Sequence, residues 1–302
     1  MLLTTFEYLK PNSLGEALDV LDELKDRKIH VLAGGTDLIP WLRARTKEAE
    51  YLVDLEGAGL NQIVFDRDQA RIGALVTFAT LSQHSEIGRK LPAIAEAAGK
   101  VGAVQTRTLA TIGGNVCSAV PSLDAAPALL VLDAQFRLQA KGEERLVAAE
   151  QFFLGPRRTV LQPGEIMTEI IVPVQDDFRA SFLRLGRRKA LTLSIVNCAA
   201  GVAVQGGGEI AKVRIALGAV APTPIRAYKA ERLLHGHRIT PELLAEAAAM
   251  AATETSPISD MRASADYRRK ISAVLVRRAL ENATGQTRQV GIKIRTAAGG
   301  SK

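Results

Sequence analysis

The sequence predicts an α+β protein whose 302 residues fall into three regions. Short apolar runs bounded by turn residues alternate with helical patterns in the first half of the chain. Later, two long apolar runs flank the glycine triplet Gly206–Gly208, and three helical patterns close the chain. Two glycine loops, at residues 33–38 and 111–115, each follow a stretch that has strand character.

The first region, residues 1–57, is expected to be a small α/β unit. Ser13 is placed to cap a helix that ends near Lys25, because apolar residues recur between them at helical spacing. A buried strand over residues 29–33 leads into the first glycine loop. A helix over residues 37–45 and a strand over residues 51–55 complete the unit.

The second region, residues 58–175, combines helices with antiparallel strands. A hairpin is expected where residues 63–65 and 71–73 flank a turn. Apolar spacing predicts three helices, over residues 80–87, 91–101 and 124–132. Two further strands are expected, over residues 135–140 and 166–172.

The third region, residues 176–284, is expected to begin with antiparallel strands over residues 180–185, 195–205 and 209–218. Three helices should follow, over residues 224–234, 241–252 and 265–283. Residues 285–302 form a tail with four basic residues and no acidic one. We expect this tail to be disordered, or ordered only by a partner.

Composition excludes several classes of protein. No signal peptide or run of about 18 apolar residues is present, so we expect a cytoplasmic protein without a membrane span. Two cysteines, Cys117 and Cys198, cannot by themselves hold an iron–sulfur cluster, and no metal site is expected. The net charge of +7 is dispersed and aromatic residues make up only 4 %, which disfavours nucleic-acid binding. The alternative explanation of the positive charge is that it contacts an acidic partner subunit, or that it only keeps the protein soluble.

The two loops suggest a phosphate-bearing ligand. Backbone N–H groups at a loop or helix start compensate phosphate charge, and glycine lets the backbone approach closely. Residues 33–38 read Ala-Gly-Gly-Thr-Asp-Leu and residues 111–115 read Thr-Ile-Gly-Gly-Asn. Neither fits the dinucleotide fingerprint G-x-G-x-x-G or a P-loop. A single Gly-Gly pair is more often a turn, but two such loops with bare N–H groups favour a ligand like a flavin dinucleotide.

With these loops, the segment 118–124 and residues 105–107, the chain resembles the FAD-binding medium subunits of the molybdenum hydroxylases. This is the family of xanthine dehydrogenase, carbon monoxide dehydrogenase and 4-hydroxybenzoyl-CoA reductase. The resemblance covers almost the whole chain. It implies a two-subdomain FAD-binding domain of the vanillyl-alcohol oxidase/MurB type over residues 1–175, divided near residue 57. It also implies a C-terminal domain over residues 176–284, a three-stranded antiparallel sheet packed with three helices.

The resemblance further implies where FAD binds. The first loop would wrap the pyrophosphate, and the second would hold the phosphates and the ribityl chain. Asp124 would accept a hydrogen bond from a ribose hydroxyl, Val101 and Gly102 would lie near the adenine, and Met167 and Arg184 near the isoalloxazine ring. The full implied set is Leu32, Ala33, Gly34, Gly35, Thr36, Asp37, Leu38, Val101, Gly102, Thr111, Gly113, Gly114, Asn115, Cys117, Ser118, Asp124, Met167 and Arg184.

Other interpretations of these residues stay open. Asp124 could simply cap the helix that follows it, and Cys117 fits a small packed side chain better than a redox thiol. Trp41 could cover the flavin, face a partner subunit or pack in the interior. The run Arg187–Lys189 could be a solvated strand end or could tune the reduced flavin.

Departures from the family pattern are informative as well. Oxidases of the wider fold often attach FAD through a histidine in the first loop, where this chain has Thr36, so non-covalent FAD is implied. The reductase has a cysteine-rich insertion for a [4Fe–4S] cluster. Here residues 115–124 contain no insertion and only Cys117, so no cluster is implied in this chain.

The implied function is that of an FAD-carrying electron-transfer subunit in which no side chain acts as a catalytic acid or base. A large subunit would carry the molybdenum cofactor, and a small subunit would carry two [2Fe–2S] clusters. An (αβγ)2 complex is implied, with NAD(P)+ or a quinone among the acceptors. The alternative is a self-sufficient FAD-dependent reductase or oxidase of the same fold.

Overall fold

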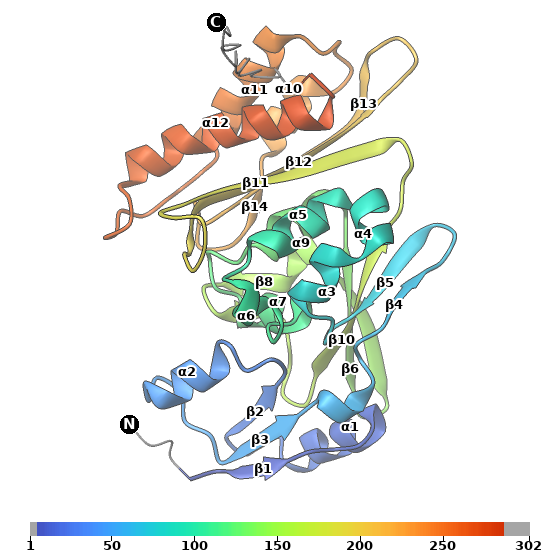
Figure 1. The fold of residues 1–302 in the computed structure, drawn as a ribbon, viewed down its shortest axis with the longest axis vertical. Helices are drawn as coiled ribbons and strands as arrows, with labels where there is room; N and C mark the ends of the chain where they lie inside the picture. The colour runs from blue at the N-terminus through green and yellow to red at the C-terminus, as the bar shows by residue number, and fades with distance from the viewer. Residues whose placement is uncertain (1–4, 287–302) are drawn as a thin grey trace, which may run out of the picture.

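Three β-sheets follow one another along the longest axis of the molecule, each with its own helices (Figure 1). The computed structural model describes residues 5–286. The basic tail expected over residues 285–302 therefore lies outside the described residues, apart from its first two. No helix in the described part of the chain is long and apolar enough to cross a membrane.

The N-terminal sheet consists of three parallel strands in the order β1-β3-β2. Ser13 caps α1 as expected, because its Oγ accepts a hydrogen bond from the N–H of Glu16 at 3.2 Å. The two helices and two strands expected here are present, whereas the first strand and the short 3₁₀ helix were not expected. The elements are β1 (Glu7–Leu9), α1 (Leu14–Glu23), β2 (Ile29–Leu32), α2 (Leu38–Arg43), β3 (Tyr51–Asp54) and the 3₁₀ helix η1 (Glu56–Ala58).

The middle sheet has five antiparallel strands in the order β4-β5-β10-β6-β7. Its strands are β4 (Ile63–Phe65), β5 (Gln69–Gly73), β6 (Gln135–Ala140), β7 (Glu143–Ala148) and β10 (Ile166–Pro173). The helices of this region are α3 (Phe78–Gln83), α4 (Ser85–Lys90), α5 (Pro92–Lys100), α6 (Val104–Arg107), α7 (Ile112–Ser118), α8 (Ala125–Val131) and α9 (Ala149–Phe152). A small hairpin, β8 (Phe153–Gly155) with β9 (Arg158–Thr159), lies between α9 and β10.

Two predictions for this region were wrong. The helix expected over residues 80–87 is two helices, because His84 has an extended backbone and its Nδ1 caps α4 by accepting the N–H of Ile87. The second glycine loop does not follow a strand. Helix α6 precedes it, and Gly113 and Gly114 lie in the first turn of α7.

The C-terminal sheet has three long antiparallel strands and a two-residue strand at its edge, in the order β11-β12-β13-β14. The helix predicted from residue 224 begins only at Tyr228, because Ile225 and Arg226 pair with β13 instead. The strands are β11 (Phe178–Gly186), β12 (Ser194–Val204), β13 (Ile210–Gly218) and β14 (Ile225–Arg226). The helices are α10 (Tyr228–Leu234), α11 (Pro241–Thr253) and α12 (Ala265–Ala283).

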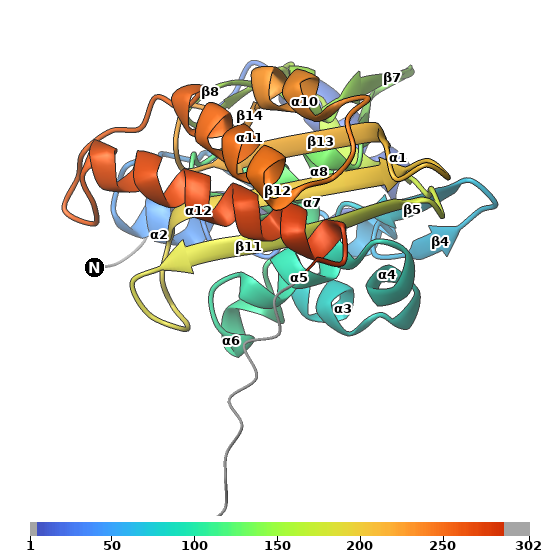
Figure 2. The ribbon, with the colours of Figure 1, turned by 90° about the horizontal axis from the view of Figure 1, so that it is seen from above.

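Helices cover the C-terminal sheet on both faces. Helices α10, α11 and α12 pack on its outer face (Figure 2), while α5 and α8 of the middle region pack on the inner face. Every residue of β12 except Val204 is buried as a consequence. Phe178, Phe182 and Ala199 belong to the same apolar core as the middle region, so the two regions are joined by a continuous core.

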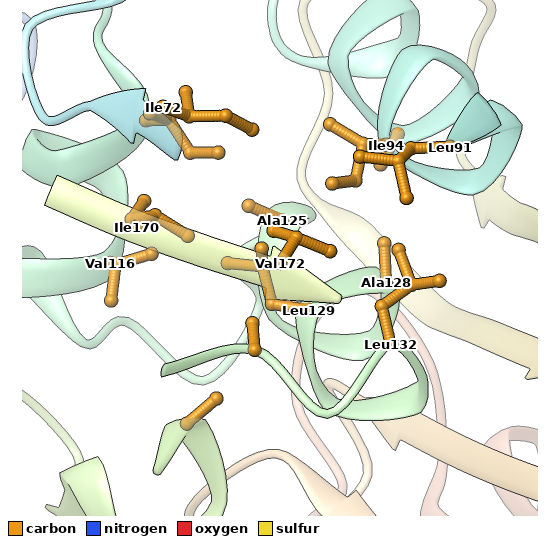
Figure 3. Packing of buried hydrophobic residues seen from close by; sticks show 14 of the residues in the cluster. Ile72, Leu91, Ile94, Val116, Ala125, Ala128, Leu129, Leu132, Ile170 and Val172 are labelled. Carbon is orange, nitrogen blue, oxygen red and sulfur yellow. The ribbon is translucent and has the colours of Figure 1, made fainter. Parts of the chain in front are cut away.

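The largest core lies between the middle sheet and its helices. Figure 3 shows Ile72 of β5 and Ile170 and Val172 of β10 facing Val116 of α7 and Leu129 of α8. Burying such aliphatic side chains contributes about 1.5–3 kcal/mol each. The core therefore fixes α7, and with it the second glycine loop, against the middle sheet.

Candidate functional site

A cavity of about 460 Å³ lies between the N-terminal sheet and the helices of the middle region, and both glycine loops line it. This volume is in the range of sites for small molecules and cofactors. All of the predicted FAD-binding residues line the cavity except Leu32 and Arg184. Residues from all three regions of the chain contribute to its wall.

The first loop connects β2 to α2 and presents backbone to the cavity. Gly35 has a φ of +68°, a conformation that favours glycine. Within the described residues, the N–H groups of Gly34, Gly35, Thr36 and Asp37 have no hydrogen-bond acceptor. Four free donors in a cavity wall form a site for an anion.

Glycine also brings the two loops together. A Cβ on Gly34 would lie 1.8 Å from the carbonyl oxygen of Leu109, just before the second loop. A Cβ on Gly114 would lie 3.6 Å from the side chain of Ala33. Gly34 is therefore required by the contact between protein backbones, whatever ligand the cavity takes.

The second loop differs from the prediction, because its backbone N–H groups are not bare. Four of its five donors, those of residues 112–115, are used within the protein, at 2.9–3.1 Å. They are Ile112 to the oxygen of Val76, Gly113 to the oxygen of Ala74, Gly114 to Oγ1 of Thr111, and Asn115 to the oxygen of Thr111. A Cβ on Gly113 would meet Ala74 at 2.6 Å, so this glycine too is required by packing.

What the second loop offers to the cavity is the side chain of Asn115. Its Oδ1 is buried and has no hydrogen-bond partner within the described residues. A buried, unpaired amide oxygen costs about 1–3 kcal/mol. A ligand that donates a hydrogen bond at this position would recover that energy.

Asp124 is held by a buried network of side chains. Its Oδ2 accepts from Nη1 of Arg184 at 2.7 Å, and its Oδ1 accepts from Oγ of Ser194 at 2.5 Å and Nδ2 of Asn197 at 2.8 Å. Burial raises the pKa of Asp124, and the attraction of Arg184 opposes that rise. The side chain makes no capping bond to α8, so the alternative role as a helix cap is not observed. The ribose contact stays a prediction.

Arg184 lies behind Asp124 and is not part of the cavity wall. Its Nη2 donates to the carbonyl oxygen of Thr192 at 2.5 Å, and its Nη1 also donates to that of Lys100. The arginine thus fastens the loop between β11 and β12 to the middle region. A contact between Arg184 and the flavin ring stays a prediction.

Of the remaining candidates, Cys117 and Trp41 line the cavity, and the run Arg187–Lys189 does not. Cys117 lines the cavity, and burial raises the pKa of its thiol to about 12, so the neutral thiol is favoured. The run Arg187–Lys189 is exposed and does not line the cavity. Trp41 does line it.

Sequence reasoning missed several residues of the wall. Val31 and Ile166 are direct neighbours of predicted residues, and His30 and Glu165 lie one position further away, so the residues leading into the predicted positions could have indicated them. Lys47 and residues 191–193 carry no sequence signal, because they reach the cavity only through the packing of separate elements. The N–H of Leu191 donates to the oxygen of Gly102 at 3.0 Å, which places residues 191–193 there.

The cavity fits a flavin dinucleotide in three respects. Free N–H groups suit its phosphates, an unpaired Asn115 oxygen suits a hydroxyl or ring N–H, and apolar wall residues such as Leu75 and Ile166 suit a ring system.

Comparisons with known proteins agree with this geometry. Residues 4–175 match the FAD binding domain in molybdopterin dehydrogenase, and residues 181–283 match the C-terminal domain of the CO dehydrogenase flavoprotein. The carbon monoxide dehydrogenase medium chain of Afipia carboxidovorans is 33 % identical over 95 % of this chain and 100 % of its own length. The glyceraldehyde dehydrogenase medium chain of Sulfolobus acidocaldarius is 31 % identical, over 91 % and 97 %.

A solved structure shares the whole fold. It is the carbon monoxide dehydrogenase of Hydrogenophaga pseudoflava, in a form lacking the Mo-pyranopterin moiety of the molybdenum cofactor. The TM-score is 0.90 at 33 % identity, and the match covers 95 % of this chain and 99 % of that one.

Proposed function

This chain belongs to the FAD-binding subunits of the molybdopterin dehydrogenases, and from that premise we propose that it carries electrons between iron–sulfur clusters and an external acceptor. As a member of that family it is an FAD-dependent oxidoreductase subunit. The proposed electron donors or receivers are [2Fe–2S] clusters on a small subunit. The proposed acceptors are NAD(P)+ or a quinone.

The observation that supports this role best is that different groups of the cavity wall suit different parts of FAD. Free N–H groups of Gly34 to Asp37 would bind the pyrophosphate, and Asn115 would bind a donor group on the ribityl or ring portion. When bound, FAD would supply the redox chemistry. The protein residues hold and orient it, and the apolar wall excludes water from the ring.

Three titratable groups of the wall, Glu165, Asp124 and His30, support a subunit without acid–base chemistry of its own. The carboxylate of Glu165 is paired with Arg145, whose Nε lies 2.7 Å away, and this pairing lowers its pKa. Asp124 is occupied by Arg184. Burial lowers the pKa of His30, which keeps its ring neutral. We therefore propose that the organic substrate reacts on another polypeptide.

That polypeptide would be a large subunit with the molybdenum cofactor. Relatives named as medium chains support this arrangement, since a medium chain implies larger and smaller partners. We propose a complex with two copies of each of three subunits. Binding of nucleic acid is not part of the proposal.

We propose that FAD is bound without a covalent link. Thr36 occupies the loop position where a histidine linkage would form, and the pKa of Cys117 disfavours the thiolate that a cysteinyl linkage needs. Acid precipitation of the flavin-loaded chain should leave all flavin in the supernatant. Flavin that stays with the polypeptide would contradict this.

The test of the proposed function is purification from the native host, followed by an absorption spectrum and identification of companion chains. Flavin bands together with iron–sulfur absorbance and two companion polypeptides are expected. Flavin on a lone chain that oxidises a substrate by itself would favour the self-sufficient reductase or oxidase. A colourless chain that takes up no added FAD would contradict both.

A further inference from the structure

Two cations contact one indole ring at the edge of the cavity. Nζ of Lys47 lies 4.9 Å from the centre of the Trp41 ring, and Cζ of Arg157 lies 5.1 Å from it. Trp41 comes from α2, Lys47 from the turn that follows, and Arg157 from the turn between β8 and β9. Trp41 and Lys47 both line the cavity. Two separate parts of the chain, residues 41–47 and the turn between β8 and β9, thus meet at the Trp41 ring.

The position of Arg157 is fixed by the backbone. Its φ is +58°, which is uncommon for a residue with a side chain. Its N–H donates to the carbonyl oxygen of Ala119 at 2.8 Å, just after α7. The turn between β8 and β9 is thus hydrogen-bonded to the end of α7, the helix that contains the second glycine loop. This contact places the guanidinium of Arg157 against Trp41.

In the part of the chain that the structure describes, no acid forms an ion pair with either of these charges. Within the described residues neither Lys47 nor Arg157 forms an ion pair. Of the acids that follow Lys47 in the sequence, Glu48 binds Lys28 at 2.7 Å and Glu50 binds Arg27 at 2.7 Å. The pKa of Lys47 is lowered by partial burial of its ammonium and by repulsion from Arg157. Lys47 in turn contributes to the lowered pKa of His30.

Two cations that contact the same ring and repel each other, with no acid paired to either, form a site that an anion would stabilise. We infer that Lys47 and Arg157, gathered on Trp41, form a phosphate subsite at the rim of the cavity. Among side chains, a guanidinium binds phosphate as a fork and an ammonium binds it as a point charge.

The ligand is the phosphate group of a nucleotide that acts as the electron acceptor, and this assignment rests on the proposed function. The free N–H groups of residues 34–37 already provide for the two phosphates of FAD, which leaves the rim cations for a second molecule. The other source of the same chemistry is the pyrophosphate of FAD itself. If the phosphate belongs to a second molecule, the subsite stays available when FAD is bound. If it belongs to FAD, bound FAD fills the subsite.

Trp41 is the only tryptophan of the chain, so its fluorescence reports this subsite alone. The experiment titrates the full chain, loaded with FAD, with inorganic pyrophosphate, and sodium chloride of equal ionic strength serves as the blank. A saturable fluorescence change is expected. Lys47→Gln and Arg157→Gln should each weaken pyrophosphate binding about tenfold, as for the loss of one charge-assisted hydrogen bond. The matched control is Arg158→Gln, which removes a neighbouring exposed charge and should bind like the wild type.

The same titration without FAD identifies the source of the phosphate. Saturable binding with FAD in place supports an external nucleotide. Binding only in the FAD-free chain, with FAD affinity about tenfold lower in Lys47→Gln, supports the subsite but assigns it to FAD and overturns the acceptor assignment. The absence of a saturable change in both forms, or equal binding by all three variants, overturns the subsite. Flavin absorbance is recorded in parallel, so failure of FAD binding is seen separately.

Discussion

The two glycine loops face the same cavity, but their backbone N–H groups have different partners. In the first loop the donors of residues 34–37 have no acceptor in the described part of the chain. In the second loop the donors of residues 112–115 all bind protein oxygens, because Ala74, Val76 and Thr111 supply the acceptors that the first turn of α7 lacks. Only the first loop is thus prepared to bind an anion through its backbone.

The difference shows that the glycines of such pairs are required for different physical reasons. Gly35 adopts a positive φ, Gly34 allows contact with the backbone of Leu109, and Gly113 allows contact with Ala74. The second and third reasons concern packing between segments. The second loop then contributes to a ligand through a side chain, that of Asn115.

The largest effect is expected from Gly34→Ala. The new Cβ would lie 1.8 Å from the oxygen of Leu109, and neither backbone can move without separating the loops. We expect loss of the cooperative thermal transition, since overpacking and backbone strain combine. Gly35→Ala is the comparison, because its Cβ meets only flexible side chains, and its positive φ should cost about 1–2 kcal/mol in the free energy of unfolding. Equal losses in the two variants would contradict a packing role for Gly34.

A large effect on stability is also expected from Arg184→Ala, on the second loop's side of the cavity. This variant leaves the carboxylate of Asp124 buried without its cation, which typically costs about 3–5 kcal/mol. Denaturant unfolding of the FAD-free chain measures the loss. The exposed Arg187→Ala should change stability by less than about 0.5 kcal/mol.

Adding Asp124→Asn to Arg184→Ala should restore part of the stability, because the uncompensated charge is removed. If Arg184→Ala instead leaves stability unchanged and shifts only the flavin potential, the arginine acts on the flavin and not on Asp124.

A smaller effect, with opposite signs in its two readouts, is expected from Asn115→Ala. Removing the unpaired amide oxygen should leave the stability of the FAD-free chain unchanged or slightly higher, while FAD affinity falls about tenfold. Thr111→Val should instead lower the stability of the FAD-free chain by about 1 kcal/mol, because it removes the acceptor of the Gly114 N–H. Unchanged FAD affinity in Asn115→Ala would remove the second loop from the site.

The smallest effect concerns Cys117, at the end of the second loop's helix. Burial raises the pKa of its thiol from the ordinary 9.0 to about 12, so the thiol is neutral at pH 8. A thiol reagent at pH 8 should label Cys117 only after unfolding. Because the folded thiol holds its proton more tightly than the unfolded one, stability should fall as the pH rises from about 9 towards 12. Rapid labelling of the native chain would show that the thiol is accessible and ionised.

Local signals in the sequence predicted much of the fold. The periodicity of residues 135–140 and 265–283 gave the bounds of β6 and α12 as observed, because these elements follow their own hydrophobic pattern. Strand β7 was missed because its first four residues are exposed and mostly charged, which leaves no alternation to detect. Strand β1 was missed because it is only three residues long and has two exposed residues.

The candidate site could be predicted only where its chemistry lies in contiguous residues. Both glycine loops were identified because each is a short local motif. Helix α7 was missed because Gly-Gly disfavours a helix, and bonds to Ala74 and Val76 override that propensity. The pairing of Asp124 with Arg184, and the approach of residues 191–193 to Gly102, depend on packing between distant segments.

The most direct test of the difference between the loops is amide hydrogen exchange of the full chain, measured with and without FAD. Without FAD, residues 34–37 should exchange rapidly while residues 112–115 are already protected. Adding FAD should protect residues 34–37 strongly and change residues 112–115 little. Protection of both loops only after FAD is added would contradict the account, as would a first loop whose exchange does not respond to FAD.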